Sequence, residues 1–69
     1  MEVFEIVNHN GNIVERIRAD RERQALCIYL MNHEELTDMM LWRNPFFEWR
    51  LAEYDNEDEY FKARKAKRY

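Results

Sequence analysis

Two histidines, one cysteine and a dense group of carboxylates are the side chains of this 69-residue chain with the chemistry of an active or metal site. His33 is followed by Glu34 and Glu35, but position 37 is threonine, so the second histidine of an H-E-x-x-H zinc motif is missing. Cys27 lies inside an apolar run, where cysteine normally behaves as a small inert hydrophobic residue. Two isolated histidines and one cysteine make no convincing metal site, so we expect neither a metal nor another cofactor.

The composition also argues against catalysis. The chain has no serine and one threonine, which excludes serine-nucleophile chemistry. Its single glycine rules out a glycine-rich loop around a phosphate. Paired catalytic carboxylates need a buried member with a raised pKa, and nothing in the acidic run of residues 53–59 indicates one. We therefore predict that the protein is not an enzyme.

Aromatic residues concentrated in residues 42–54 indicate a binding surface instead. A small sheet cannot easily cover all of them, and Trp, Tyr and Arg dominate the energetics of protein interfaces. We expect a protein-interaction site anchored by Trp42, Arg43, Phe46, Trp49 and Arg50. The following carboxylates would form its electrostatic rim: Glu53, Asp55, Glu57, Asp58 and Glu59. The same acidic run is also compatible with imitation of a nucleic-acid backbone.

The basic residues support an alternative, which is direct binding of nucleic acid. Phosphate contacts require clustered Lys and Arg side chains. The candidates are Arg16, Arg18, Arg21, Arg23, Lys62, Arg64 and Lys65. The formal charge of −3 and the pI near 5.3 weigh against this alternative, because domains that bind nucleic acid usually have a pI above about 9.

Residues 2–19 have the pattern of a β-hairpin. Asn10-Gly11 is a strong signal for a two-residue turn in which both residues take positive φ. That turn predicts three cross-strand pairs: Phe4 with Ile17, Glu5 with Arg16, and Val7 with Val14.

Two helices are predicted after the hairpin. Asp20 is a suitable N-cap for the first, and residues 25–31 are apolar on every face, so this helix should be buried on two sides or lie against a partner. Asn32 followed by Glu35 has the spacing of a capping box and predicts a second helix that ends near Trp42.

The last part of the chain allows two interpretations at one point. Residues 46–54 alternate apolar and polar side chains, which favours a strand, although Asn44-Pro45 would also suit the start of a helix. A strand is preferred because a lone hairpin is only marginally stable. Residues 56–69 are predicted to form a charged C-terminal helix, with acids in its first half and bases in its second.

These elements predict a small α+β protein, ββααβα, with a short antiparallel sheet covered by helices. The chain length fits a single domain spanning residues 1–69. No apolar run reaches the ~20 residues that a membrane span needs, and no secretory signal is evident, so a cytoplasmic location without membrane contact is expected. The apolar content of 46% leaves a homodimer open.

In its organisation the chain resembles small accessory proteins of bacteriophages that bind and inhibit host enzymes or defence complexes. The resemblance covers residues 3–54: a hairpin that leads through Ile17-Arg18-Ala19-Asp20 into a helix with Ala25-Leu26, and a later aromatic strand. The resemblance assigns a functional role to no residue of this chain. It implies a small protein-interaction module that binds a larger host or cognate protein stoichiometrically and inhibits or modulates it.

Overall fold

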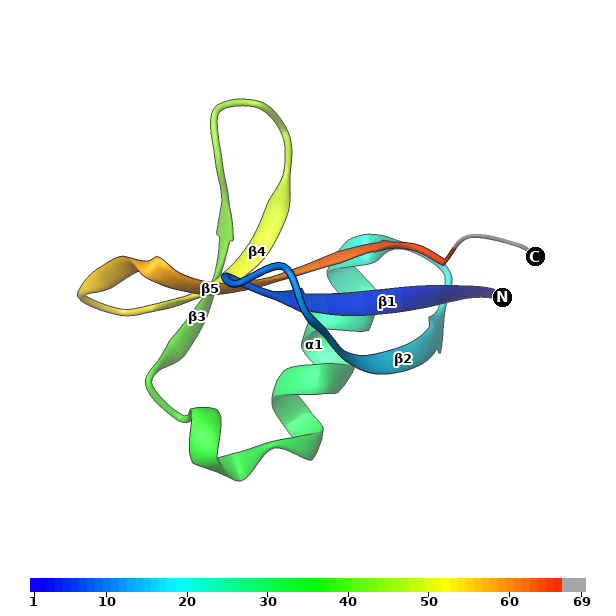
Figure 1. The fold of residues 1–69 in the computed structure, drawn as a ribbon, viewed down its shortest axis with the longest axis horizontal. Helices are drawn as coiled ribbons and strands as arrows, with labels where there is room; N and C mark the ends of the chain where they lie inside the picture. Colours follow the sequence, from blue (N-terminus) through cyan, green and yellow to red (C-terminus); the bar gives the residue numbers. More distant parts are fainter. Residues whose placement is uncertain (67–69) are drawn as a thin grey trace.

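A computed structural model describes residues 1–66 and shows a five-stranded antiparallel sheet with one α-helix packed on one face (Figure 1). The order of the strands in the sheet is β2-β1-β5-β4-β3, so the C-terminal strand lies in the middle. In chain order the elements are β1 (Glu2–Asn8), β2 (Ile13–Ala19), α1 (Glu22–Asn32), the short 3-10 helix η1 (Glu34–Leu36), β3 (Met39–Arg43), β4 (Trp49–Glu53) and β5 (Asn56–Lys65).

The predicted ββααβα layout is therefore wrong. Two of its three helices are absent from the described residues, and a sheet of five strands replaces the predicted sheet of three. The hairpin, the first helix and a strand within residues 46–54 are confirmed as β1–β2, α1 and β4. No helix in residues 1–66 is long and apolar enough to span a membrane.

The predicted second helix fails because its capping signal supports only one turn. The Leu36 N–H donates to the His33 carbonyl oxygen over 3.0 Å, which closes η1, and the chain then extends into β3. Met39 and Leu41 pack against the core, while Met40 and Trp42 point to the opposite face. This alternation fits a strand, and pairing with β4 satisfies the N–H and C=O groups on one side of β3 along its length.

The predicted C-terminal helix is a strand as far as Lys65. β5 is hydrogen-bonded to β1 on one side and to β4 on the other, so it completes the ladders of both neighbours. Its inward side chain Phe61 packs against Tyr29 of α1, with ring centroids 5.2 Å apart. An i,i+4 ion pair in a helix contributes only about 0.2–0.5 kcal/mol, too little to compete with these tertiary contacts. Residues 67–69 of the predicted helix lie outside the described residues.

The β1–β2 register agrees with the prediction except near the turn. Phe4 faces Ile17 and Glu5 faces Arg16, as expected, but Val7 pairs with Ile13 instead of Val14. The loop contains three residues instead of two, and only Gly11 in it has a positive φ, of 84°. The register shifts by one residue between Ile6 and Val7, and this β-bulge restores the predicted pairing beyond it.

Helix α1 covers one face of the sheet with Ala25, Leu26 and Tyr29. Its N-cap is Arg21 and not the predicted Asp20; the Asp20 N–H instead donates to Oε1 of Gln24 over 2.6 Å. The buried cluster beneath the helix consists of Phe4, Ile6, Ile17, Ala19, Ala25, Leu26, Tyr29 and Leu51. No helix or strand of the described chain covers the opposite face of the sheet, which we call the open face.

Candidate protein-interaction site

The β3–β4 loop, residues 44–48, is closed by hydrogen bonds centred on Asn44. The Asn44 N–H donates to the Glu48 carbonyl oxygen, and the Phe47 N–H donates to the Asn44 carbonyl oxygen, both over 3.1 Å. The Asn44 side-chain oxygen accepts from the N–H groups of Phe46 and Glu48, both at 3.0 Å. This is the pattern of a type I turn followed by one residue in the left-handed region, and proline suits its second position.

The β1–β2 loop, residues 8–12, has the same four hydrogen bonds. The Asn8 N–H donates to the Asn12 carbonyl oxygen and the Gly11 N–H to the Asn8 carbonyl oxygen, both over 2.9 Å. The Asn8 side-chain oxygen accepts from the N–H groups of Asn10 and Asn12, at 3.1 and 2.9 Å. Gly11 thus occupies the position that Phe47 has in the other loop.

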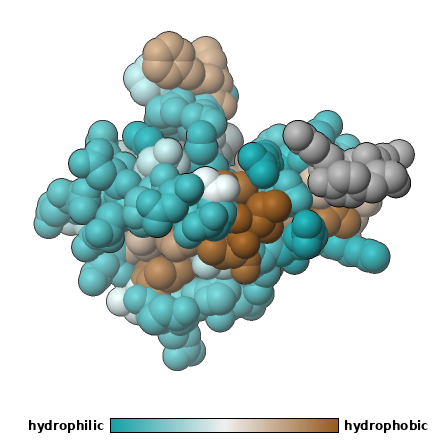
Figure 2. All heavy atoms as spheres, viewed as in Figure 1, coloured by the Kyte–Doolittle hydropathy of each residue, from teal (hydrophilic) through white to brown (hydrophobic). Residues whose placement is uncertain are grey.

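Phe47 has a φ of 63°, a conformation that is unfavourable for a bulky side chain. It nevertheless remains 76% exposed, and its neighbour Phe46 is 87% exposed. Burial within this chain therefore stabilises neither ring to any large extent. The loop stands clear of the rest of the chain at the top of Figure 1. Figure 2 shows apolar side chains at this projecting end, separated by polar ones from the apolar patch in the middle of the near side. We call Phe46 and Phe47 the aromatic tip.

Arg43 and Trp49, two of the predicted anchors, support the aromatic tip from below. The Arg43 guanidinium lies 5.0 Å from the ring centroid of Phe47 and 5.3 Å from that of Trp49, within the range of a cation–π contact. Trp49 is half-buried against the core and has the guanidinium of Arg23 at 5.2 Å. Trp49 therefore connects the aromatic tip to the packed interior.

Glu48 fixes the other side of the loop. Its carboxylate accepts a hydrogen bond from Lys62 Nζ over 3.0 Å and another from the Asn44 side-chain amide over 3.1 Å. The hydrogen bond from Lys62 holds the pKa of Glu48 below its usual value of 4.5. Loop 44–48 is thus tied to the centre of the sheet, because Lys62 belongs to β5.

The remaining predicted anchors, Trp42 and Arg50, lie on the open face. Trp42 is 36% exposed and pairs with Arg50 across the two strands. The Arg50 guanidinium lies 5.2 Å from the ring centroid of Tyr60 and 3.9 Å from the Glu57 carboxylate. These two residues are therefore adjacent to the aromatic tip in sequence but belong to the surface of the sheet.

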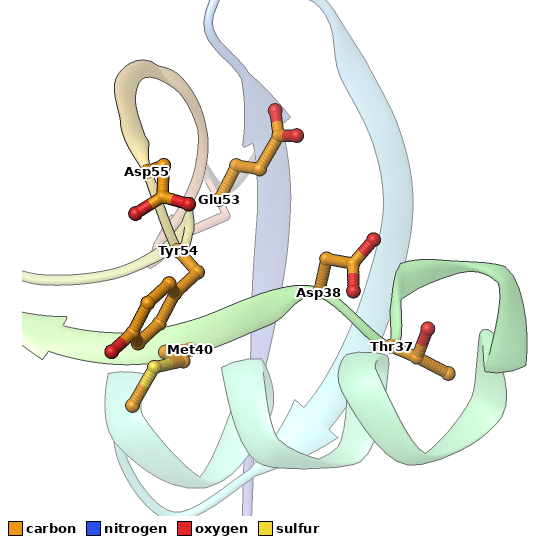
Figure 3. A pocket seen from close by; sticks show the side chains of 6 residues that line it. All are labelled: Thr37, Asp38, Met40, Glu53, Tyr54 and Asp55. Atoms are coloured by element: carbon orange, nitrogen blue, oxygen red, sulfur yellow. The ribbon is translucent and has the colours of Figure 1, made fainter.

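The predicted acidic rim is at the far end of β4 from the aromatic tip. Trp49 and Glu53, the ends of this strand, are about 13 Å apart at the usual rise of a strand. Glu53 and Asp55 line a pocket of about 460 Å³ together with Asp38, and Figure 3 shows their carboxylates around it. A hydrogen bond with the side chain of Glu59 raises the pKa of Glu53, and repulsion from the surrounding carboxylates acts in the same direction.

The predicted basic residues divide between the two sides of the sheet. Alternation along the strands places Arg16, Arg18, Lys62 and Arg64 on the open face. Arg21 and Arg23 belong to the start of α1, and Lys65, the last residue of β5, has its ammonium 3.4 Å from the Glu2 carboxylate.

Carboxylates already accompany most of the cations on the open face. Glu5, which is buried, lies between Arg16 at 3.4 Å and Arg64 at 3.2 Å. Lys62 contacts Glu48 at 3.0 Å. The positive charge of this face is therefore partly neutralised within the chain itself.

His33 lies between two carboxylates at the end of α1. His33 Nδ1 is 3.0 Å from the Glu35 carboxylate and His33 Nε2 is 3.6 Å from that of Glu15, so this histidine links the end of α1 to β2. The hydrogen bond with Glu35 raises the pKa of His33. Cys27 is half-buried in α1. Residues 1–66 contain no group of three or more His, Cys, Asp or Glu side chains arranged to hold a metal ion.

Phe47 was included in the aromatic stretch of residues 42–54 but was not selected as an anchor from the sequence. The signal was present, because asparagine followed by proline is typical of the first two positions of a type I turn, and alternating apolar and polar residues follow it. Comparisons with protein-family models, with curated proteins and with solved structures gave no match to this chain. The function must therefore be argued from the residues described above.

Proposed function

We propose that this chain is a cytoplasmic protein-binding module, not an enzyme, that binds a larger protein stoichiometrically through the aromatic tip. The observation that carries the proposal is Phe47, a bulky residue in the left-handed region that stays 76% exposed in its own chain. Residues held in unfavourable backbone conformations concentrate at sites of function. A pair of exposed phenylalanines is an expected form for such a site, since aromatic anchors dominate interface energetics.

The binding partner should offer an apolar pocket. Burying one phenylalanine side chain contributes about 1.5–3 kcal/mol, so the two rings together can account for a specific complex. The Asn44 hydrogen bonds and the Arg43 contact hold the rings before binding, which reduces the conformational entropy lost on association. Inhibition of the partner by this binding stays a prediction, based on the resemblance of the sequence to the bacteriophage proteins.

Capture of the partner tests this proposal. The tagged protein is expressed in its native host and purified with and without nuclease and high salt. We expect one stoichiometric protein that survives both treatments, that Phe46→Ala and Phe47→Gly lose, and that Met31→Ala retains. Met31 is the matched control because it is 77% exposed and lies on α1, away from the tip. Equal capture by all four proteins, with each shown to be folded, would contradict the proposal.

Nucleic-acid binding through the open face is the second candidate function. The observation in its favour is that Arg16, Arg18, Lys62 and Arg64 share this face. The carboxylates of Glu5 and Glu48 beside three of these cations weigh against it. Binding of a labelled oligonucleotide that falls steeply with salt and is lost in Arg18→Glu would favour this function over the aromatic tip.

A further inference from the structure

The two edges of the sheet differ in how well they are protected against pairing with another strand. An edge strand exposes unpaired N–H and C=O groups, and proteins usually block such edges with bulges, charges or proline. The β2 edge has a bulge where the register shifts, and Glu15, Arg16 and Arg18 follow one another closely along it. The β3 edge, Met39–Arg43, pairs with β4 without a shift and carries one charged residue, at its end.

The side chains of β3 are apolar on both faces. On the open face Met40 is 45% and Trp42 is 36% exposed. On the helix face Met39 borders a cavity of about 440 Å³ whose lining includes Leu30 and Leu36. A strand added to this edge would bury apolar surface on both faces while satisfying the free backbone groups.

Opposite charges at the two ends of β3 determine the direction of such a strand. The acidic pocket lies at the start of β3, where Asp38 precedes the strand and Glu53 pairs with Met39. Arg43 lies at the other end. A second β3 in antiparallel orientation would bring each Arg43 toward the acidic end of the other copy, whereas a parallel one would place acid beside acid.

We infer that the β3 edge binds a second copy of this chain, and that two β3 strands pair antiparallel about a two-fold axis to form a continuous ten-stranded sheet. Such a contact is isologous, so the same residues serve both copies. Directly opposed residues must lie on the same face, and a register centred on Leu41 satisfies this condition. In that register Met40 faces the partner's Trp42 twice, once in each half of the interface.

The surroundings of Met40 suit an incoming indole ring. Tyr54, which is 63% exposed, lines the same pocket as Met40, and Figure 3 shows its ring beside the Met40 thioether. The partner's Trp42 would therefore contact an aromatic ring and a polarisable sulfur, both of which pack well against an indole. The aromatic tip follows β3 in sequence, so it extends past the shared strands and remains available in each copy.

The mass in solution tests the dimer. Light scattering on the full chain, over a range of concentrations, should give twice the chain mass of 8.7 kDa. Met40→Lys, Asp38→Arg and Arg43→Asp should each weaken the dimer by about tenfold or more, because they introduce a charge or a like-charge pair at the interface. The double variant with Asp38→Arg and Arg43→Asp should recover much of the dimer, since the swapped charges again face each other.

Three control measurements separate this surface from others. Arg18→Glu, on the β2 edge, and Phe46→Ala, at the aromatic tip, should leave the dimer intact, and circular dichroism confirms that each variant is folded. A monomer at every concentration would overturn the inference, as would a dimer unaffected by all three β3 variants. A monomer whose β3 amides become protected from hydrogen exchange only with a captured protein would assign the edge to that protein. Failure of the unmodified chain to capture any partner, with the dimer intact, would contradict only the proposed function.

Discussion

The loops of the two hairpins, residues 8–12 and 44–48, share one set of hydrogen bonds and differ at the position that needs a positive φ. The first loop has Gly11 there, which takes this conformation without strain. The second has Phe47, for which the conformation costs roughly 1–2 kcal/mol. A 69-residue chain has little stability to lose, often about 3–5 kcal/mol. The proposed role of the second loop in recognition would account for this difference.

The comparison also shows that asparagine, more than glycine, defines this turn. Asn8 and Asn44 each accept hydrogen bonds from two backbone N–H groups, whatever residue follows in the left-handed position. Side-chain bonds of this kind imitate a backbone turn. The asparagine side chain therefore holds the turn whichever residue occupies the left-handed position, so the residue type at that position can vary.

The largest effect is expected from removing the asparagine of each loop. Asn44→Ala loses two acceptor bonds to the backbone and one donor bond to Glu48, and should lower the free energy of unfolding by about 2 kcal/mol. Asn8→Ala loses only the two acceptor bonds and leaves an unstrained glycine, so its loss should be smaller. Urea unfolding measures both. If Asn8→Ala were the less stable of the two variants, the claim that the two asparagines hold matching turns would be contradicted.

A smaller loss, of about 1 kcal/mol, is expected from Gly11→Ala. No atom outside the neighbouring residues lies within 4 Å of the added methyl group, so the loss measures the cost of the left-handed backbone alone. Gly11→Asn is the matched control and should lose less, because asparagine tolerates this conformation. Unchanged unfolding by urea in the alanine variant would mean that positive φ is not required there.

The smallest effect is a pH dependence of local stability, which we expect in loop 44–48 and not in loop 8–12. The pKa of Glu48 is lowered in the folded state, so its contribution to stability is present above its usual pKa of 4.5 and is lost as the pH falls through the lowered value. Amide hydrogen exchange should therefore speed up in residues 44–48 on acidification, with no matching change in residues 8–12. Glu48→Gln should abolish this pH dependence. Equal acceleration in both loops would show that the whole sheet responds.

The sequence predicted those parts of the fold that depend on neighbouring residues. Alternation and Asn10-Gly11 located the first hairpin, and Phe4–Ile17 and Glu5–Arg16 were paired correctly. The pairing of Val7 was wrong because a loop one residue longer and a bulge at Val14 compensate for each other within the same hairpin.

The parts that depend on distant residues were not predicted. Residues 56–65 carry charges spaced for a helix, and only their pairing with β1 and β4, on both sides, makes them a strand. Similarly, the capping signal at Asn32 competes with the pairing of Met39–Arg43 to β4, and the pairing prevails. Local propensity is overridden here by long-range contacts of a kind that a single sequence does not display.

The candidate site was predicted in composition more than in arrangement. Arg43, Phe46 and Trp49 do lie together at one end of the β3–β4 hairpin. The acidic residues expected around them lie at the other end of β4, because residues 53–59 form the β4–β5 connection and the start of β5 instead of a helix. Phe47 was not selected as an anchor because what distinguishes it is its backbone conformation, which a sequence pattern does not reveal.

The most direct test of this account is Phe47→Gly, measured for both unfolding and partner capture. Glycine relieves the left-handed strain but removes the contact with Arg43, so the free energy of unfolding should stay equal or rise by up to about 1 kcal/mol. Capture of the stoichiometric partner should be lost at the same time. A variant that is clearly less stable, or one that still captures the partner as the unmodified chain does, would contradict the claim that this loop sacrifices stability for recognition.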